Sequence, residues 1–506
     1  MNCELMLKTF RNGDTLLVKD VPEIALVEFL QALVELTGLG WHIASYFGIP
    51  HKEGAELWCI MAGSNQLLGA FRSRVADSLP SITGACPEAH LFEREIAEQC
   101  GIPLDGHPWF KPLRYQASLR PGHDAWRRDT NNAILPAVGD FYQVEGPEIH
   151  EVAVGPVHAG IIEPGHFRFQ CHGETVFHLE IALGYQHRGL ERGLTGGPHA
   201  ATMVQIETAA GDSTAAHSIA YAMIREGLAD MEAPARAHSL QAIALELERL
   251  ANHCGDLGAL AGDVGFLPTM SFCGRIRGDF LNLSAELCGS RFGRGLIRPG
   301  GVYFDCAPEQ ADGMVQRLEK IHRDYSGAVE LLWDSASVMA RFEKTGLVTL
   351  GEADDLGLVG PAARASGIAR DVRRDHPFGI YRATAPAIAL EPGGDVHARA
   401  LLRWKESRIS LGFIAERLNS LPEGEILRPC EATRPERVAV ALVEGWRGEI
   451  CHVAITDAAG KFLRYKIKDP SFHNWHGLAM SLRNQQISDF PLCNKSFNLS
   501  YCGFDL

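Results

Sequence analysis

Side chains that can exchange protons are concentrated in two stretches of the chain. One runs from Glu207 to His217 with the sequence ETAAGDSTAAH and contains Asp212; the other contains His158 and His166. Carboxyl and imidazole groups can bind a carbonyl oxygen and protonate it as the carbonyl is reduced. Asp212, His166 and His217 are therefore candidate catalytic residues for a carbonyl-bearing ligand.

Asp212 can be interpreted in two ways. A carboxylate that is buried without a partner has a raised pKa, which would suit a proton donor. Alternatively, Asp212 caps the helix or pairs with an arginine such as Arg447, and then serves structure alone. The sequence favours neither interpretation over the other.

Helices are expected to position these residues. Apolar residues recur at helical spacing in 200–226 and 237–260, and 207–218 is expected to begin a buried helix. Residues 438–465 alternate apolar and polar side chains around a turn at 457–460, which predicts a small antiparallel sheet. The three residues from His172 to Glu174 are expected to form a hairpin turn.

The first hundred residues predict a smaller, mixed unit. Helices are expected at 21–36 and 65–79, with strands at 41–47 and 56–61 between them. Residues 89–108 read as a capped helix followed by a turn. Overall the sequence predicts an α+β protein, in which a small N-terminal α/β module (1–110) and a linker (111–146) precede a mainly helical domain with small antiparallel β elements (147–506).

Composition excludes several classes of function. The net charge of −14 over 506 residues argues against nucleic-acid binding, which needs a clustered excess of Lys and Arg. No apolar stretch reaches the roughly 20 residues of a membrane helix, and no export signal is visible. The 13 cysteines include no Cys-x-x-Cys pair, so most are expected to be buried apolar side chains.

Several stretches match a known protein family. The sequence FEREIAEQCGIPLDGHP, within 89–108, resembles the smaller peripheral-arm subunit of respiratory complex I. The sequences GPVHAGIIEPGHFR and GYQHRGLE resemble the large subunits of energy-converting nickel-iron hydrogenases, of the formate hydrogenlyase and hydrogenase-4 type, and the related complex I quinone-site subunit. Further matches follow in the same order, at 248–253, 262–266, 297–302, 360–377 and 443–449.

The resemblance also shows what is missing. In the hydrogenases two Cys-x-x-Cys motifs hold nickel, and the first matches residues 207–218 with neither cysteine present. The second, aligned on Asp489 to Leu492, also lacks both cysteines, although Cys502 lies one residue away. The four vacated ligand positions are Ala210, Ser213, Ser500 and Gly503. Alanine and glycine have no donor atom and serine cannot replace a thiolate, so we expect no metal.

The complex I quinone-site subunit has likewise lost the metal, and it binds a quinone headgroup in the vacated cavity. In that subunit a loop histidine and a tyrosine hydrogen-bond the quinone carbonyls. Here the histidine position falls at Pro164, with His166 two positions on, and the tyrosine position falls close to Gly211. Asp212 and the loop histidines are therefore the candidates to replace them.

The resemblance implies a subunit of a membrane-bound complex that is not active alone. It would dock an iron-sulfur subunit, with Arg188 near its terminal cluster, and pass electrons to a ligand such as a quinone, coupled to ion translocation. Pocket or cluster-facing residues would be His158, Arg188, Glu207, Ser213, Arg447 and Cys502. The chain itself would hold no cofactor, and antiporter-like and anchor subunits would keep it at the cytoplasmic side of the membrane. The alternatives are a redox-inactive coupling subunit and, more distantly, a hydrogenase.

Overall fold

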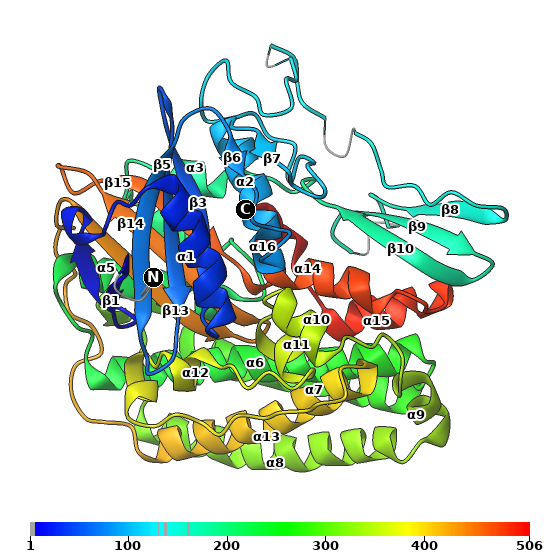
Figure 1. Ribbon diagram of the computed structural model, residues 1–506. Helices are drawn as coiled ribbons and strands as arrows, with labels where there is room; N and C mark the ends of the chain where they lie inside the picture. The colour runs from blue at the N-terminus through cyan, green and yellow to red at the C-terminus, as the bar shows by residue number, and fades with distance from the viewer. Residues whose placement is uncertain (1–5, 130, 136–138, 159–161) are drawn as a thin grey trace.

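Two antiparallel sheets lie above a layer of long helices, which confirms the predicted α+β class (Figure 1). The computed structural model describes residues 6–129, 131–135, 139–158 and 162–506. One core of buried apolar side chains extends from Leu7 to Leu506, so the N-terminal and C-terminal parts pack together. The division into a module, a linker and a larger domain stays a prediction.

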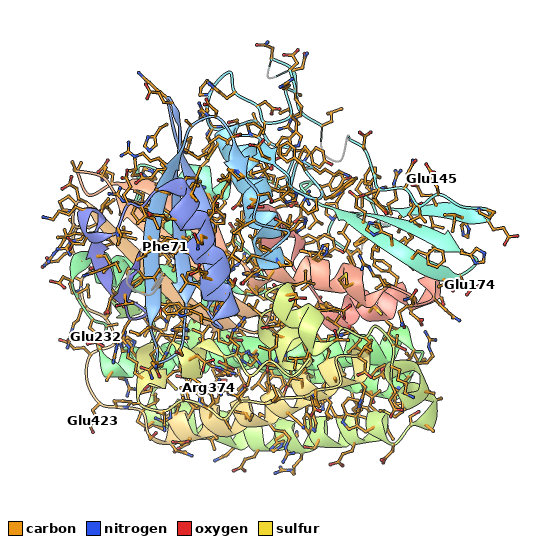
Figure 2. All side chains as sticks on the ribbon, in the orientation of Figure 1. Phe71, Glu145, Glu174, Glu232, Arg374 and Glu423 are labelled. Carbon is orange, nitrogen blue, oxygen red and sulfur yellow. The ribbon has the colours of Figure 1, made fainter. Side chains whose placement is uncertain are left out.

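The N-terminal sheet has the strand order β1-β5-β4-β3, formed by Lys8–Phe10, Leu68–Val75, Gly54–Ala62 and His42–His51. Helix α1 (Leu26–Gly38) packs against this sheet, and Phe71 of strand β5 is fully buried (Figure 2). The helix predicted at 65–79 is wrong, because β5 occupies this stretch. Asn65 and Gln66 adopt positive φ angles of 57° and 62° and turn the chain back, so β5 pairs along all of β4.

The second sheet joins distant parts of the chain. Its order is β15-β14-β13-β2, formed by Phe462–Lys468, Gly448–Thr456, Arg437–Gly445 and Thr15–Leu17. The predicted turn at 457–460 does connect β14 to β15. Helix α5 (Thr214–Ala229) packs on β13 and β14, which places the 207–218 stretch at the end of this sheet.

The helical layer is built around α6 (Ala235–Asp263), which packs against α7 (Leu267–Cys288) and α13 (Val396–Asn419). Helix α8 (Pro308–Trp333) packs on α7 and α13 at the base of the molecule (Figure 1). Most of α6 is buried on every side, which explains its largely apolar and alanine-rich sequence. None of the described helices is long and apolar enough to cross a membrane.

A third sheet of order β10-β9-β8 projects from the right of Figure 1. Its strands are Thr175–Ala182, His166–His172 and Ile149–Val154, and β9 meets β10 at the predicted hairpin turn, near which Glu174 points outward (Figure 2). The predicted linker runs irregularly but is partly buried, because Arg114 pairs with Glu95 and donates to the Phe504 carbonyl at 2.8 Å.

The remaining elements are short or lie at the edges of these layers. They are β6 (Leu79–Pro80), β7 (Leu104–Asp105), β11 (Ile297–Arg298), β12 (Gly301–Val302), α2 (His90–Cys100), α3 (Leu190–Leu194), α4 (Thr202–Ile206), α9 (Ala336–Phe342), α10 (Leu350–Asp355), α11 (Gly360–Arg364), α12 (Val372–Asp375), α14 (Pro470–Ser481), α15 (Phe490–Phe497) and α16 (Tyr501–Asp505). Nine of the twelve described cysteines are buried; Cys3 lies outside the described residues.

Candidate functional site

The two stretches that the resemblance aligns with the halves of the nickel motif lie side by side. Residues 207–213 form the turn between α4 and α5, so the helix predicted to start near Glu207 begins only at Thr214. The C-terminal stretch forms helix α16. Arg188 links the two stretches, because its guanidinium donates to the carbonyls of Thr208 (2.7 Å), Ala209 (3.1 Å) and Cys502 (3.3 Å). The Arg188 side chain remains exposed while it makes these bonds.

Asp212 pairs with Arg447, which was one of the two alternatives predicted for this carboxylate. Arg447, in the turn between β13 and β14, donates to both Asp212 oxygens at 2.5 and 2.8 Å. Arg447 also donates to the Asn498 carbonyl at 2.6 Å and lies 3.9 Å from the centre of the Trp446 ring. Burial alone would lower the pKa of Arg447, but the Asp212 carboxylate raises it above its ordinary value.

The vacated ligand positions are closely packed. Arg447 approaches the Ser213 hydroxyl at 3.4 Å, and the Ser500 hydroxyl accepts from the Gly503 amide at 2.9 Å. A Cβ atom added at Gly503 would lie 2.7 Å from Asp469 Cγ, so a cysteine there would collide. These side chains lack the thiolates that a nickel site requires. Among the described residues, no group of three or more His, Cys, Asp or Glu side chains could hold a metal ion.

His217 faces the interior rather than the surface near Asp212. Its side chain is fully buried, and its two nitrogens contact Asp469 Oδ2 at 3.2 Å and His452 Nε2 at 3.0 Å. His452 in turn contacts the Tyr465 hydroxyl at 2.9 Å. Sequence reasoning missed Asp469, His452 and Tyr465, since each lies more than 200 residues from His217 and no local motif marks them.

The loop before β9 contributes His158, and the first residue of β9 is His166. His158 Nε2 contacts the Gly165 carbonyl at 2.8 Å, and His166 Nδ1 contacts the Gly155 carbonyl at 3.2 Å. Burial lowers the pKa of His166. Both rings therefore make hydrogen bonds within the loop, and no direct contact joins either of them to Asp212.

Glu163, which sequence reasoning also missed, connects this loop to α16. Its carboxylate accepts from the Tyr501 amide at 3.3 Å and lies near Cys502. Burial, and then the negative charge of Glu163, raise the pKa of the Cys502 thiol to about 11. Cys502 is therefore a protonated thiol at neutral pH and a poor nucleophile or metal ligand.

Glu207 has a positioning contact. Its Oε1 accepts from the Gly295 amide at 2.9 Å and from Arg298 at 2.8 Å. It thereby attaches the turn before α5 to the loop that follows α7. Glu207 is nearly buried, so it fixes this loop rather than presenting a free carboxylate.

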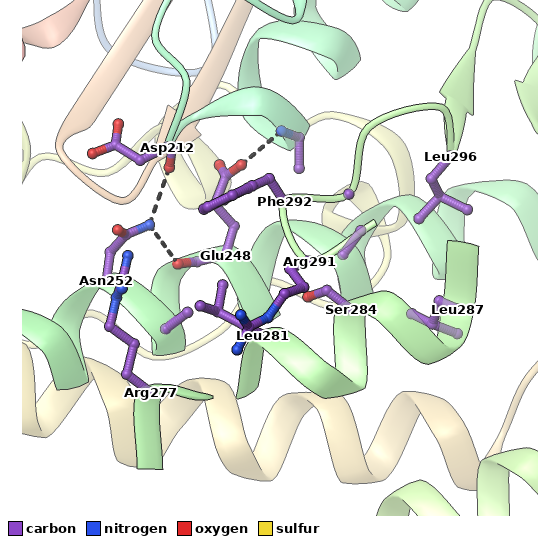
Figure 3. Close-up of a pocket in the computed structure, with 14 residues that line it drawn as sticks. Asp212, Glu248, Asn252, Arg277, Leu281, Ser284, Leu287, Arg291, Phe292 and Leu296 are labelled. Carbon is purple, nitrogen blue, oxygen red and sulfur yellow. Dashed lines mark hydrogen bonds between the residues drawn. The ribbon is translucent and has the colours of Figure 1, made fainter. Parts of the chain in front are cut away.

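A small cavity of about 20 Å³ lies on the other side of Asp212, between α6, α7 and the loop 289–296 (Figure 3). Its wall is mainly apolar, and Glu248 provides a carboxyl group. The Glu248 carboxylate accepts from the amides of Ala215 (2.7 Å) and Ala216 (3.3 Å) at the start of α5. Asn252 bridges to the Asp212 carbonyl at 3.0 Å.

Glu248 is the group in this cavity that can exchange a proton near neutral pH. Burial raises its pKa from 4.5 to about 8, although the two amide hydrogen bonds oppose the rise. At pH 7 it is therefore a carboxylic acid and can donate a hydrogen bond. The matched motif at 248–253 pointed to this segment, but nothing in it distinguished Glu248 as a buried acid.

Two protein families match most of the chain. The family described as respiratory-chain NADH dehydrogenase, 30 Kd subunit, matches residues 21–133. The family described as respiratory-chain NADH dehydrogenase, 49 Kd subunit, matches residues 263–437 and 427–505. The chain therefore joins in one polypeptide two units that these families describe separately.

Individual relatives are similar over most of their length. The carbon monoxide-induced hydrogenase of Rhodospirillum rubrum is 30% identical over 69% of this chain and 97% of its own. Hydrogenase-4 component G of Escherichia coli is 28% identical over 92% and 81%. An NADH-quinone oxidoreductase component of Solibacter usitatus is 27% identical over 63% and 86%. These matches confirm the resemblance found in the sequence.

A solved structure shares the fold. A chain from the membrane-bound sulfane sulfur reductase, an archaeal respiratory membrane complex, superimposes with a TM-score of 0.65. The match covers 71% of this chain and 99% of that one, at 23% identity. At this level of identity the similarity establishes the fold and leaves the chemistry of the site open.

Proposed function

Because this chain belongs to the family of complex I 49-kDa subunits and related hydrogenase subunits, with a 30-kDa-type unit joined to it, we propose a peripheral subunit of a membrane-bound oxidoreductase complex. It docks an iron-sulfur subunit and passes electrons from that partner's cluster to a carbonyl-bearing ligand such as a quinone. Anchor and antiporter-like subunits hold it at the membrane and couple the reaction to ion movement.

The bonding of Arg188 is the observation that carries this proposal. Three backbone carbonyls from both halves of the vacated site accept from one guanidinium, which still faces the surface. A cation fixed in this way stabilises negative charge on a neighbouring group, and more strongly once a partner excludes water. This arrangement supports docking of a reduced, negatively charged cluster at Arg188.

The ligand would bind next to Asp212 on the exposed side of the turn, because the cavity beside Glu248 measures only about 20 Å³. The Asp212 side chain is about 35% exposed, so a ligand can reach it without displacing the packed residues behind it. Asp212 would orient a ligand through its arginine pair, while Glu248 supplies a proton. His166 and His158 would complete the pocket from the loop side.

A second function is favoured by the packing of the vacated site. Ser500 and Asp469 fill the space around Gly503, and Arg447 lies against Ser213. A subunit with no ligand there would couple movements of its partners without taking part in electron transfer. Both functions require the Arg188 contact, and they differ in whether a ligand is reduced.

The test is to purify the membrane complex with Arg188→Gln and with Arg192→Gln as the matched control. Arg192 is exposed and lines the same surface groove as Arg188. We expect Arg188→Gln to lower the potential of the terminal cluster and slow reduction of a soluble quinone analogue, with Arg192→Gln unchanged. A wild-type complex with a reducible cluster and no quinone reductase activity would favour the coupling function. If Arg188→Gln changed neither the potential of the terminal cluster nor the rate of quinone reduction, docking at this arginine would be refuted.

A further inference from the structure

Four buried side chains form one continuous file of hydrogen bonds beside the vacated site. Asp469 Oδ2 contacts His217 Nε2 at 3.2 Å, His217 Nδ1 contacts His452 Nε2 at 3.0 Å, and His452 Nδ1 contacts the Tyr465 hydroxyl at 2.9 Å. All four side chains are essentially inaccessible to solvent. Water therefore cannot substitute for any of these hydrogen bonds, and each contact needs one donor and one acceptor.

The Asp469 carboxylate at one end of this hydrogen-bonded chain determines which atom donates in each of its three hydrogen bonds. Burial alone would raise the pKa of Asp469, but the hydrogen bond from His217 and the Arg447 charge lower it, so Asp469 is ionised. His217 must then carry its proton on Nε2 and, when neutral, accept at Nδ1. His452 must therefore donate from Nε2 and accept at Nδ1, and Tyr465 must donate its hydroxyl proton.

The same file can accommodate one additional proton. When a proton is added at Tyr465, the original hydroxyl proton moves to His452 Nδ1 and the Nε2 proton of His452 moves to His217 Nδ1. His217 is then protonated on both nitrogens, and His452 donates to the Tyr465 oxygen. Every contact keeps one donor and one acceptor, and the added positive charge lies next to the Asp469 carboxylate. The two states differ by a single proton and a change of tautomer at His452.

We propose that the His217 and His452 pair is a one-proton store, positioned by Asp469 and Tyr465, that exchanges its proton with the candidate site. The exit is at Asp469, whose carboxyl carbon lies against the Gly503 position and whose charge is felt by Arg447. The Nε2 proton of His217 passes to the Asp469 carboxylate, which leaves His217 neutral with its proton on Nδ1 and His452 unchanged; the same proton can return along this contact, so no proton is created or lost. The link to ligand reduction rests on the proposed function, whereas the store itself does not.

Charged groups on the surrounding elements affect how readily His217 and His452 bind an added proton. Burial and the charge of His217 lower the pKa of His452 well below its ordinary value. The proposal places the added proton on His217 because that ring contacts the Asp469 carboxylate at 3.2 Å. Arg447 opposes added positive charge, Asp469 favours it, and Glu191 does so more weakly because Lys466 pairs with it at 2.7 Å. Tyr221 and Arg225 on α5 face the Tyr465 end.

Nitrogen NMR of the full chain, labelled with ¹⁵N-histidine, tests the store directly. At neutral pH we expect both rings to carry their proton on Nε2, and on acidification both to change in one step as a single proton binds. Signals are assigned from His217→Gln and His452→Gln. A proton on Nδ1 of His452 at neutral pH, or two independent titrations, would overturn the proposal.

Asp469→Asn tests the anchor of the file. Asparagine keeps the cap of α14, where Asp469 accepts from the Ser471 amide at 2.8 Å, but removes the anion. We expect the proton affinity of the pair to fall about tenfold or more. Asp395→Asn is the matched control, since Asp395 caps α13 with a 2.8 Å bond from Ala398 and touches no histidine. An equal response of the two variants would refute the role of Asp469.

The proposal and the proposed function fail separately. The NMR titration needs no turnover. If the complex reduces no quinone analogue but the two histidines still titrate together, only the proposed function is contradicted. If the analogue is reduced but the two histidines do not titrate together, only the proposal of a proton store is contradicted. When both hold, Asp469→Asn should shift the pH profile of the reduction rate, whereas Asp395→Asn should leave it unchanged.

Discussion

Replacing Glu248 by glutamine should remove a large pH dependence from the stability of the chain. Glutamine has the shape of the protonated acid, and its carbonyl can still accept the shorter bond, from the Ala215 amide, while the longer bond from the Ala216 amide to the other oxygen is lost. The folded pKa of Glu248 is about 8, above its ordinary value of 4.5, so the folded protein binds the proton more tightly than the unfolded chain. This stabilisation is complete below pH 4.5 and is lost as the pH rises through 8.

The two pKa values set the size of the effect. A difference of 3.5 units between 4.5 and about 8 corresponds to about 5 kcal/mol, at roughly 1.4 kcal/mol per unit. Part of the carboxyl faces the cavity, so we expect about 3 to 5 kcal/mol. Wild type should lose this amount relative to Glu248→Gln between pH 4.5 and pH 9. At pH 9 the variant should be the more stable protein.

Urea denaturation at pH 5 and pH 9, followed by far-UV circular dichroism, measures this difference. Other buried acids also titrate in this range, among them Glu226, whose pKa burial raises to about 7, but they cancel between wild type and variant. Glu423→Gln is the control, because Glu423 is exposed at the edge of the molecule (Figure 2). If the gap between wild type and Glu248→Gln were the same at both pH values, the assignment of Glu248 as a buried neutral acid would be wrong.

Three further substitutions have defined outcomes in the same assay at pH 7. Arg447→Met should cost about 3 kcal/mol, because Asp212 and a buried carbonyl each lose a charged donor; the partial exposure of Asp212 limits its share. Gly503→Ala should cost about 1 to 2 kcal/mol, because the new methyl would lie 2.7 Å from Asp469 Cγ. Arg364→Met should cost about 3 to 5 kcal/mol, because the fully buried carboxylates of Glu406 and Glu444 would lose their ion pairs with this arginine.

Controls of the same chemistry separate these effects from general damage. Arg374→Met removes an exposed arginine whose ion pair with Asp375 lies at the surface (Figure 2) and should change stability by less than about 1 kcal/mol. Gly313→Ala adds a methyl to α8 where no atom lies within 4 Å, and should stabilise by up to about 1 kcal/mol. If Gly313→Ala and Gly503→Ala behaved alike, crowding at Gly503 would not be the cause.

Patterns that rest on local periodicity predicted most of the fold. The 237–260 helix and the hairpins at 172–174 and 457–460 depend on neighbouring residues, and the structure contains all three. The strand at Leu68–Val75 was missed, because it is decided by pairing with β4 rather than by its own spacing. Membership of β2 in the C-terminal sheet could not be predicted either, since its partner lies more than 400 residues away.

The site was predictable only where a motif carried it. Quoted motifs located Asp212, Arg447 and Arg188, and the pairing of the first two was one of the open alternatives. Nothing local indicates that Asp469, at the start of α14, would meet His217, because that contact spans 252 residues. Glu163 was likewise invisible, since its role depends on the loop folding over α16.

The charge at the centre of the site constrains what chemistry it can perform. Arg447 lies between Asp212 and the Asp469 side of the vacated positions, where it provides a fixed positive charge. A guanidinium can neither change its oxidation state nor release its proton near neutral pH, so it orients groups without exchanging electrons or protons. Protons must therefore come from the groups on either side of it, Glu248 in the cavity and the histidine pair behind Asp469. Under the proposed function, an electron delivered near Arg188 is taken up by a ligand that lies within reach of one of these two proton sources.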